Sequence, residues 1–185
     1  MQDYREFIAE ILIDKEKLQA RIAEMGAQIS RDYAGQDLLL ICILRGGMVF
    51  LVDLMRCISV PHQLDFMAVS SYGAGARRSG GSVRLSLDLK TDIRDKNVLL
   101  VEDIIDSGNT IAYVLEFLQT RQPRSLKVCT LLDKPERRET PVPIDYCGFV
   151  IPNKFVFGYG LDLDEYYRNL PYVAVVDTGK YHPPE

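Results

Sequence analysis

The chain has 185 residues, of which 47% are hydrophobic and 26% are charged, and its formal net charge is −4. These values are ordinary for a globular protein, and the length suits a single domain with a substantial core. The acidic balance, with no basic arm or stripe, argues against a nucleic-acid partner. The longest clean apolar run, residues 38–44, has the length of a strand and is too short to span a membrane, so we expect no membrane partner.

The cysteines indicate a reducing compartment. Cys42, Cys57, Cys129 and Cys147 lie far apart, without the spacing of a metal knuckle or a redox motif. We therefore expect reduced thiols in a cytoplasmic protein. The first six residues are polar and acidic, unlike a signal peptide.

The first predicted element is an amphipathic helix at about residues 14–32. Its apolar side chains, Leu18, Ile22, Met25 and Ile29, recur at spacings of three and four, with charged residues on the other face. We expect this helix to cover a sheet.

A strand–turn–helix unit follows. Residues 38–44 predict a buried strand, and an Arg-Gly-Gly turn at 45–47 ends it. A helix is expected over residues 48–58, because Pro61 forbids continuation. The next strand is expected at residues 64–70, which completes a βαβ unit.

A long glycine-rich segment comes next. Residues 71–82 contain four glycines, and a loop of this length inside a compact domain is usually functional or mobile. Apolar and polar residues then alternate over 83–89, the pattern of a half-exposed strand. Together these segments predict a long hairpin arm that can fold over a site.

The most informative stretch is residues 98–110. Four apolar residues suit a strand buried on both faces, and the carboxylates Glu102, Asp103 and Asp106 follow it. Residues 107–110, Ser-Gly-Asn-Thr, then open a helix that extends to about residue 121, with backbone N–H groups free to bind a phosphate. Carboxylates beside a phosphate imply either a divalent cation such as Mg²⁺ or contacts to sugar hydroxyls.

Two further strands are expected after this helix, at residues 126–132 and 172–176, with an apolar segment at 146–151 between them. Strands that alternate with helices predict an α/β fold with a doubly wound, mainly parallel sheet flanked by helices. Ligands of such sheets lie beyond the carboxyl ends of the strands. Arg45, the acidic turn and Lys134 each follow a strand, so we expect them to converge on one edge.

Each of these features also has a plain structural explanation. Asp106 or Ser107 could cap the helix, and adjacent surface acids or a glycine turn are common. Phe155 and Val156 suit a core, and Lys154 suits solvent. The string at 98–110, taken whole, favours a functional site.

That string, Val-Leu-Leu-Val-Glu-Asp-Ile-Ile-Asp-Ser-Gly-Asn-Thr, closely resembles the motif with which type I phosphoribosyltransferases bind phosphoribosyl pyrophosphate. Much of the chain is similar to the bacterial hypoxanthine (hypoxanthine-guanine) branch of that family. Residues 44–47 match its pyrophosphate loop, 70–73 match the start of its mobile catalytic loop, and Arg168 matches a late arginine. Arg45 stands where relatives often carry lysine, which is also cationic but differs in geometry.

The resemblance implies a purine salvage enzyme that uses Mg²⁺ and converts hypoxanthine, and guanine, with phosphoribosyl pyrophosphate to the nucleoside monophosphate and pyrophosphate. It implies Asp106 as the catalytic general base. The implied site residues are, for the phosphoribosyl group and its 5′-phosphate, Glu102, Asp103, Asp106, Ser107, Gly108, Asn109, Thr110 and Ile111; for pyrophosphate, Arg45, Gly46 and Arg168; for the mobile loop, Ser71 and Tyr72; for the purine, Lys134, Lys154, Phe155, Val156 and Asp162; and for the metal, Glu102, Asp103 and Asp162.

Several further expectations accompany the resemblance. Lys134 can only donate hydrogen bonds, so it suits a 6-oxopurine and opposes the amino group of adenine. The family implies a cis peptide between Leu44 and Arg45, and homodimers or homotetramers. We expect one domain, with a core at about 36–135 and a purine-binding hood built from about 136–185 and the N-terminal segment.

Three other functions stay open on the sequence. The chain could be a regulator of the same fold that senses phosphoribosyl pyrophosphate and binds DNA or RNA, although it shows no added nucleic-acid-binding motif. It could be a phosphoribosyltransferase for another base, such as xanthine or uracil. A generic nucleotide-binding module is disfavoured, because the chain contains no G-x-x-x-x-G-K-[ST] or G-x-G-x-x-G element.

Overall fold

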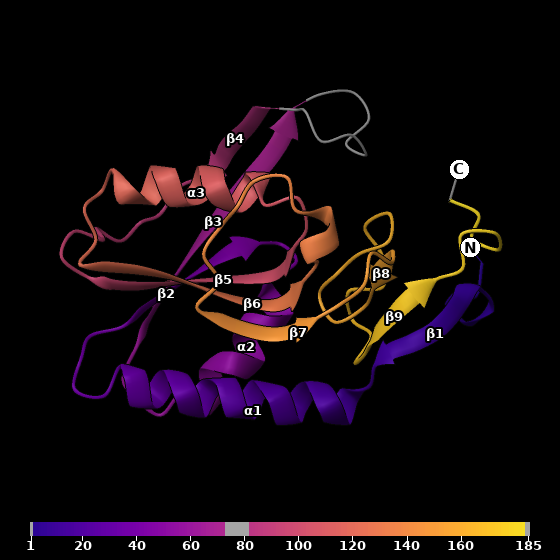
Figure 1. Cartoon of the computed structure of the whole chain (residues 1–185), viewed down its shortest axis with the longest axis horizontal. Helices are drawn as coiled ribbons and strands as arrows, with labels where there is room; N and C mark the ends of the chain where they lie inside the picture. Colours follow the sequence, from indigo (N-terminus) through magenta and orange to yellow (C-terminus); the bar gives the residue numbers. More distant parts are fainter. Residues whose placement is uncertain (1, 73–81, 184–185) are drawn as a thin grey trace.

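The structure, a computed structural model, describes residues 2–72 and 82–183 (Figure 1). Its centre is a six-stranded sheet in the order β4-β3-β2-β5-β6-β7, parallel except for the β3–β4 pair. The strands are β2 (Leu39–Leu44), β3 (Gln63–Tyr72), β4 (Ser82–Leu87), β5 (Asn97–Ile105), β6 (Ser125–Asp133) and β7 (Tyr146–Val150). The predicted doubly wound, mainly parallel sheet is therefore confirmed.

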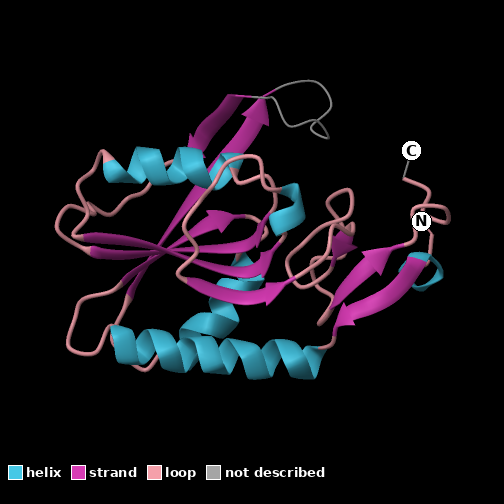
Figure 2. Ribbon diagram, in the orientation of Figure 1, coloured by secondary structure: helices cyan, strands magenta, loops and turns pink. Residues whose placement is uncertain are grey.

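Helices cover both faces of this sheet (Figures 1 and 2). On one face lie α1 (Lys15–Asp32) and α2 (Met48–Cys57), which pack together over the sheet; α3 (Asn109–Gln119) covers the other face. Asp14 caps α1, because its Oδ1 accepts a hydrogen bond from the Lys17 N–H at 2.9 Å. The four apolar residues that predicted α1 are all buried against the sheet.

The chain ends form a second, smaller sheet. Strands β1 (Ile8–Ile13), β9 (Val173–Val176) and β8 (Val156–Phe157) pair in that order and antiparallel, beside the 3₁₀ helix η1 (Tyr4–Phe7). Phe7, Phe157 and Leu163 are among the residues of its own small core. Both termini lie at this end of the molecule (Figure 1). The expected hood of terminal segments is confirmed, although the sequence patterns did not predict β1.

Several predicted boundaries differ from the structure. Strand β3 continues to Tyr72, so Ser71 and Tyr72, expected in the glycine-rich loop, belong to this strand. Strand β5 continues to Ile105, so Glu102 and Asp103 lie within it and not after it, because ladder pairing with β6 extends as far as Ile105 and Asp133. Strand β4 ends at Leu87, short of the expected residue 89. The β3–β4 pair confirms the body of the hairpin arm, but residues 73–81 at its tip lie outside the described residues.

The strand order sets the position of the site. The neighbours β2 and β5 are parallel; the chain continues from β2 to β3 on one side and from β5 to β6 on the other. The turns after β2 and β5 therefore diverge, which opens a crevice at the carboxyl edge of the sheet.

Two other expectations concern the cysteines and the membrane. All four cysteines are free thiols, and Cys42 and Cys129 are buried in the core. None of the helices in the described ranges is both long and apolar enough to cross a membrane.

Candidate active site at the carboxyl edge of the sheet

The turn between β5 and α3 is built to bind an anion. Gly108 is the N-cap of α3, in the left-handed conformation (φ 86°), and has no side chain to cap the helix; Ser107 Oγ accepts one long hydrogen bond of 3.4 Å from the Asn109 N–H. The first intrahelical bond runs from the Ala112 N–H to the Gly108 carbonyl oxygen at 2.9 Å, so the N–H groups of the first turn have no helical partner. A cavity of about 100 Å³ lies here, lined by Glu102, Ile104, Ile105, Asp106, Ser107, Gly108, Thr110 and Ile111.

Only glycine fits at position 108. A Cβ added there would lie 2.2 Å from the carbonyl oxygen of Thr140. The Glu139 and Thr140 N–H groups donate to the Ser107 carbonyl oxygen at 2.8 and 3.0 Å, and Asn109 Nδ2 donates to Glu139 Oε2 at 2.8 Å. Hydrogen bonds from the segment before β7 thus stabilise the turn between β5 and α3.

The acidic pair is largely buried: Asp103 is 7% exposed, and Glu102 is partly buried at the wall of the small cavity. Burial, with the neighbouring Asp103 charge, raises the pKa of Glu102 well above its usual value. Burial is also the largest cause that raises the pKa of Asp103 to about 6, and it is opposed by the Ile104 N–H, which donates to Asp103 Oδ1 at 2.8 Å, and by Arg168. Both carboxylates therefore favour a cationic neighbour.

The residues present fit Mg²⁺. Glu102 Oε2 is buried, and none of the described residues donates a hydrogen bond to it. The described ranges hold no cluster of three or more potential metal-ligating side chains. That donor set suits Mg²⁺, which typically takes one or two protein carboxylates and completes its octahedron with water and substrate oxygens.

The turn after β2 meets the acidic pair. The Leu44–Arg45 peptide is cis, as expected. A Cβ at Gly46 would lie 1.8 Å from Asp103 Oδ2, so only glycine allows this approach. Gly160 (φ +98°) packs on the same turn, since its Cβ would lie 2.3 Å from the Gly46 carbonyl oxygen.

A charged cluster lies above this turn. Arg168 Nη1 donates to the Gly160 carbonyl oxygen at 2.9 Å, and its Nη2 lies 2.9 Å from Asp162 Oδ1. Arg45 Nη2 lies 2.8 Å from Glu165. The two arginines predicted for pyrophosphate are therefore brought together, with Asp162 and Glu165 as their partners.

A larger cavity, of about 590 Å³, lies between the sheet edge and the hood. It is lined by Asp106, Lys134, Arg137, Asn153, Lys154, Phe155, Val176, Thr178, Tyr181 and Pro183. Lys134 is 6% exposed, and burial lowers the pKa of its ammonium group while Asp106 opposes that shift. Phe155 is 51% exposed and presents its ring for stacking.

Comparison with known proteins agrees with this geometry. Residues 9–164 match the model of the phosphoribosyl transferase domain. The chain is 51% identical to the hypoxanthine phosphoribosyltransferase of Salmonella typhimurium over 169 residues, 90% of this chain and 94% of the relative. It is also 51% identical to the hypoxanthine-guanine phosphoribosyltransferase of Mycobacterium avium over 180 residues, 94% of this chain and 88% of the relative.

A crystal structure of a hypoxanthine phosphoribosyltransferase from Staphylococcus aureus superposes with a TM-score of 0.91 at 41% identity and covers 97% of both chains. The chain belongs to the phosphoribosyltransferase family. Within that family it is similar to enzymes named hypoxanthine phosphoribosyltransferase and hypoxanthine-guanine phosphoribosyltransferase.

Not every predicted residue of this phosphoribosyltransferase lies in a cavity wall. Val156 is 5% exposed and packs in the core, so only its backbone is available for the purine edge. Asp162 does not line the larger cavity; its carboxylate binds Arg168 and accepts from the Glu165 N–H at 2.9 Å. Residues 73–81 of the predicted mobile loop, which follow Ser71 and Tyr72, lie outside the described residues.

The structure also adds residues that the sequence analysis of this phosphoribosyltransferase did not single out. Arg137, on the 3₁₀ helix η2 (Pro135–Arg137), places Nε 3.3 Å from Asp106 Oδ1. Arg138 Nε donates to the Asp106 carbonyl oxygen at 3.1 Å. The available signal was two adjacent arginines shortly after strand β6, which ends at Asp133.

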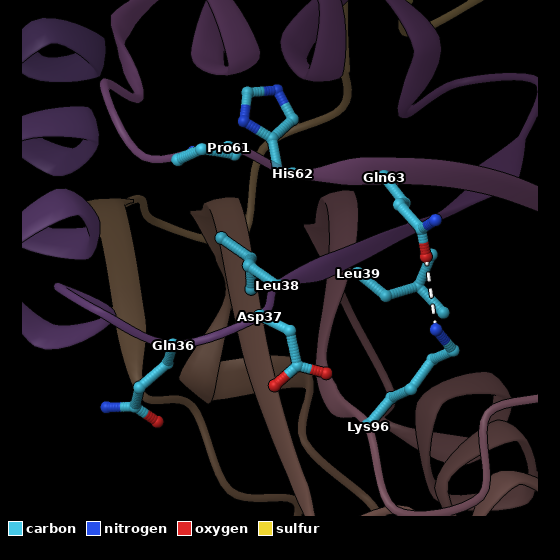
Figure 3. Close-up of a pocket in the computed structure, with 8 residues that line it drawn as sticks. All are labelled: Gln36, Asp37, Leu38, Leu39, Pro61, His62, Gln63 and Lys96. Carbon is cyan, nitrogen blue, oxygen red and sulfur yellow. Dashed lines mark hydrogen bonds between the residues drawn. The ribbon is translucent and has the colours of Figure 1, made fainter.

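Another cavity of the phosphoribosyltransferase, of about 260 Å³, lies at the opposite edge of the sheet (Figure 3). It is lined by Gln36, Asp37, Leu38, Leu39, Pro61, His62, Gln63 and Lys96. These residues surround the amino ends of β2 and β3, and Lys96 Nζ donates to Gln63 Oε1 at 3.2 Å. None of the predicted site residues lines this cavity, so we assign the chemistry to the carboxyl edge.

Proposed function

We propose that the enzyme transfers the phosphoribosyl group of phosphoribosyl pyrophosphate to hypoxanthine, and to guanine, releasing pyrophosphate and IMP or GMP. One observation carries the proposal: Asp106 lines both the phosphate-sized cavity at the start of α3 and the larger cavity that contains Lys134. A single carboxylate is thus within reach of a sugar phosphate and of a base.

The 5′-phosphate is assigned to the turn at Ser107, Gly108, Asn109, Thr110 and Ile111. Backbone N–H groups at the start of α3 supply several donors to one anion. The dipole of the helix adds about 0.3–1 kcal/mol in the same direction.

The purine is assigned to the larger cavity. The Lys134 ammonium donates to the 6-oxo group, and Lys154 flanks the same wall. Phe155 stacks on the ring, while the backbone at Val156 reads its edge. Adenine is disfavoured because its 6-amino group would face another donor, and an unpaired buried donor costs about 1–3 kcal/mol.

Asp106 is assigned as the general base. The purine ring nitrogen loses its proton as the new bond to C1 of the ribose forms, and a positioned carboxylate accepts that proton. Because C1 carries positive charge in the transition state, as in glycoside cleavage, the negative Asp106 and the acidic pair also favour that charge.

Glu102 and Asp103 are assigned to the ribose hydroxyls and to Mg²⁺. Asp162, which forms no cluster of three potential ligands with described side chains, is assigned to a second metal ion or to the far side of the purine pocket. Magnesium, when bound, neutralises charge on the departing pyrophosphate and fixes its orientation. Arg45, the Gly46 N–H and Arg168 bind the pyrophosphate itself. The loop that begins at Ser71 and Tyr72 is assigned to water exclusion, because water would otherwise hydrolyse the activated sugar.

A homodimer or homotetramer in the cytoplasm is part of the proposal. The reduced state of all four cysteines supports the cytoplasm, and size-exclusion chromatography with light scattering would measure the oligomer.

A steady-state assay tests the function. Phosphoribosyl pyrophosphate and Mg²⁺ are supplied with hypoxanthine, guanine, xanthine, uracil or adenine in turn, and with EDTA in a parallel series. We expect turnover with hypoxanthine and guanine and none with EDTA. Turnover with xanthine or uracil alone would replace the base assignment. Turnover that survives EDTA would refute the role of Mg²⁺.

Absence of turnover with any base, together with filter binding of random nucleic acid at low salt, would indicate a regulator instead.

A further inference from the structure

Glu165 lies between the two arginines assigned to pyrophosphate. Arg45 Nη2 is 2.8 Å from both carboxylate oxygens of Glu165, and Arg168 Nη2 is 3.3 Å from Glu165 Oε2. One arginine follows β2 and the other belongs to the hood, so a single side chain bridges two separate parts of the site.

The backbone holds Glu165 in this position. Leu163 and Tyr166 exchange two backbone hydrogen bonds of 3.1 Å, which enclose the two-residue turn of Asp164 (φ 49°) and Glu165 (φ 73°). Two consecutive left-handed residues suit a turn that usually contains asparagine and glycine, and a glutamate there is unfavourable. The Asp162 carboxylate also accepts from the Glu165 N–H at 2.9 Å.

The contact uses donors that a pyrophosphate group would need. A guanidinium binds a carboxylate or a phosphate through the same N–H groups, so the two anions compete for the Nη2 donors of Arg45 and Arg168. The Arg45 and Glu165 side chains are 69% and 59% exposed, respectively. Such a solvent-screened pair is weak, and an anion with several charges can displace it.

We propose that Glu165 is an internal competitor for pyrophosphate. Its carboxylate neutralises Arg45 and Arg168 in the free enzyme, leaves them when phosphoribosyl pyrophosphate binds, and returns as pyrophosphate departs. This proposal rests on the proposed function, in which these arginines bind the pyrophosphate group. Glu165 therefore weakens the binding of both ligands and limits product inhibition.

A purely positioning role for Glu165 predicts the opposite change in pyrophosphate affinity. If Glu165 only positioned the two arginines, its removal would misplace them and weaken pyrophosphate binding. The sign of the change in affinity therefore separates a competitor from a positioning residue.

Glu165→Gln tests the proposal, because it keeps the shape of the side chain and removes the charge. We expect the KM for phosphoribosyl pyrophosphate and the inhibition constant for pyrophosphate to fall by about three- to tenfold, as the loss of two screened charge pairs implies. The KM for hypoxanthine should not change. Unchanged or weaker pyrophosphate binding would overturn the proposal.

Glu24→Gln is the matched control. Glu24 lies on the exposed face of α1 and pairs with Arg21 at 2.8 Å, so the variant loses the same charge in the same type of contact outside the site. A gain in affinity that Glu24→Gln reproduces would reflect net charge alone and would also overturn the proposal.

Calorimetric titration with magnesium pyrophosphate separates the inference from the function on which it rests. If the single variant Arg45→Met binds magnesium pyrophosphate as tightly as the wild-type protein does, the assignment of the pyrophosphate site fails. The inference then loses its basis. If Arg45→Met weakens binding but Glu165→Gln does not strengthen it, only the inference fails. In Arg45→Met protein we expect the effect of Glu165→Gln to shrink, because one of the two competed contacts is gone.

Discussion

The guanidinium of Arg137 lies beside the carboxylate of Asp106, with 3.3 Å between Nε and Oδ1. Arg138 binds the carbonyl oxygen of the same aspartate at 3.1 Å, so its backbone and its side chain are both held. The N-cap of α3 is Gly108, which excludes helix capping as the role of Asp106. These contacts orient a carboxylate at the junction of the two cavities, where the proposed proton transfer takes place.

Asp106→Asn should therefore lower kcat by about 10²–10⁴-fold, the usual contribution of a positioned general base. The KM for phosphoribosyl pyrophosphate should change little, because the backbone N–H groups of the turn remain. Steady-state kinetics with hypoxanthine measure both constants. Asp95→Asn is the control, since Asp95 is exposed and asparagine tolerates its left-handed backbone (φ 59°). Full activity of Asp106→Asn would contradict the assignment.

Gly108→Ala should damage the phosphate turn. The residue has φ 86°, and the new Cβ would lie 2.2 Å from the Thr140 carbonyl oxygen. Gly35→Ala introduces similar left-handed strain (φ +73°), but no described heavy atom lies within 4 Å of its Cβ. We expect both variants to lose about 1–2 kcal/mol of stability from strain, and only Gly108→Ala to raise the KM for phosphoribosyl pyrophosphate. Equal KM values in the two variants would show that the turn does not bind the phosphate.

The central sheet could be predicted from the sequence because its signals are local. The β2 strand is apolar throughout, and α1 repeats its apolar residues at helical spacing. The hood sheet could not be predicted in the same way. Residues Ile8–Ile13 show no clean alternation of apolar and polar side chains, and they become a strand because β9, from the other end of the chain, pairs with them.

The residues of the site likewise fall into two groups, those with a local sequence signal and those without one. Lys134 and the string at 98–110 carry their own motif, so sequence analysis singled them out. Arg137 and Glu165 do not, because each acquires its role from a partner far away in the chain: Asp106 is 31 residues from Arg137, and Arg45 is 120 residues from Glu165. Only the fold reveals these pairs.

Lys134→Gln should relax the choice of base. Glutamine can accept as well as donate a hydrogen bond, so the 6-amino group of adenine gains a partner. We expect the ratio of kcat/KM for hypoxanthine to that for adenine to fall by roughly 10- to 100-fold, which corresponds to about 1–3 kcal/mol. Lys154→Gln should change the ratio less, because Lys154 lines the same cavity but pairs with Glu10. An unchanged ratio in Lys134→Gln would move base selection elsewhere.

Asp103→Asn should stabilise the metal-free protein while it impairs catalysis. Burial raises the pKa of Asp103 to about 6, against about 3.9 in an unfolded chain. The folded state therefore holds its proton more tightly, and ionisation of Asp103 makes the free energy of unfolding fall as pH rises from about 4 to about 6. Above that window the buried charge costs about 2–3 kcal/mol, which asparagine avoids.

Thermal unfolding in EDTA, followed from about pH 4 to about pH 8, measures this effect. We expect Asp103→Asn to exceed wild type by roughly 5 °C in Tm at about pH 8 and to match it near about pH 4. Asp95→Asn should follow wild type throughout, because Asp95 is exposed. A difference that does not vary with pH, or a less stable variant at about pH 8, would show that the Asp103 carboxylate is not destabilised by burial. In that case the ionised Asp103 carboxylate would need no cation to offset its burial. Its assignment to Mg²⁺ would then lose its physical basis.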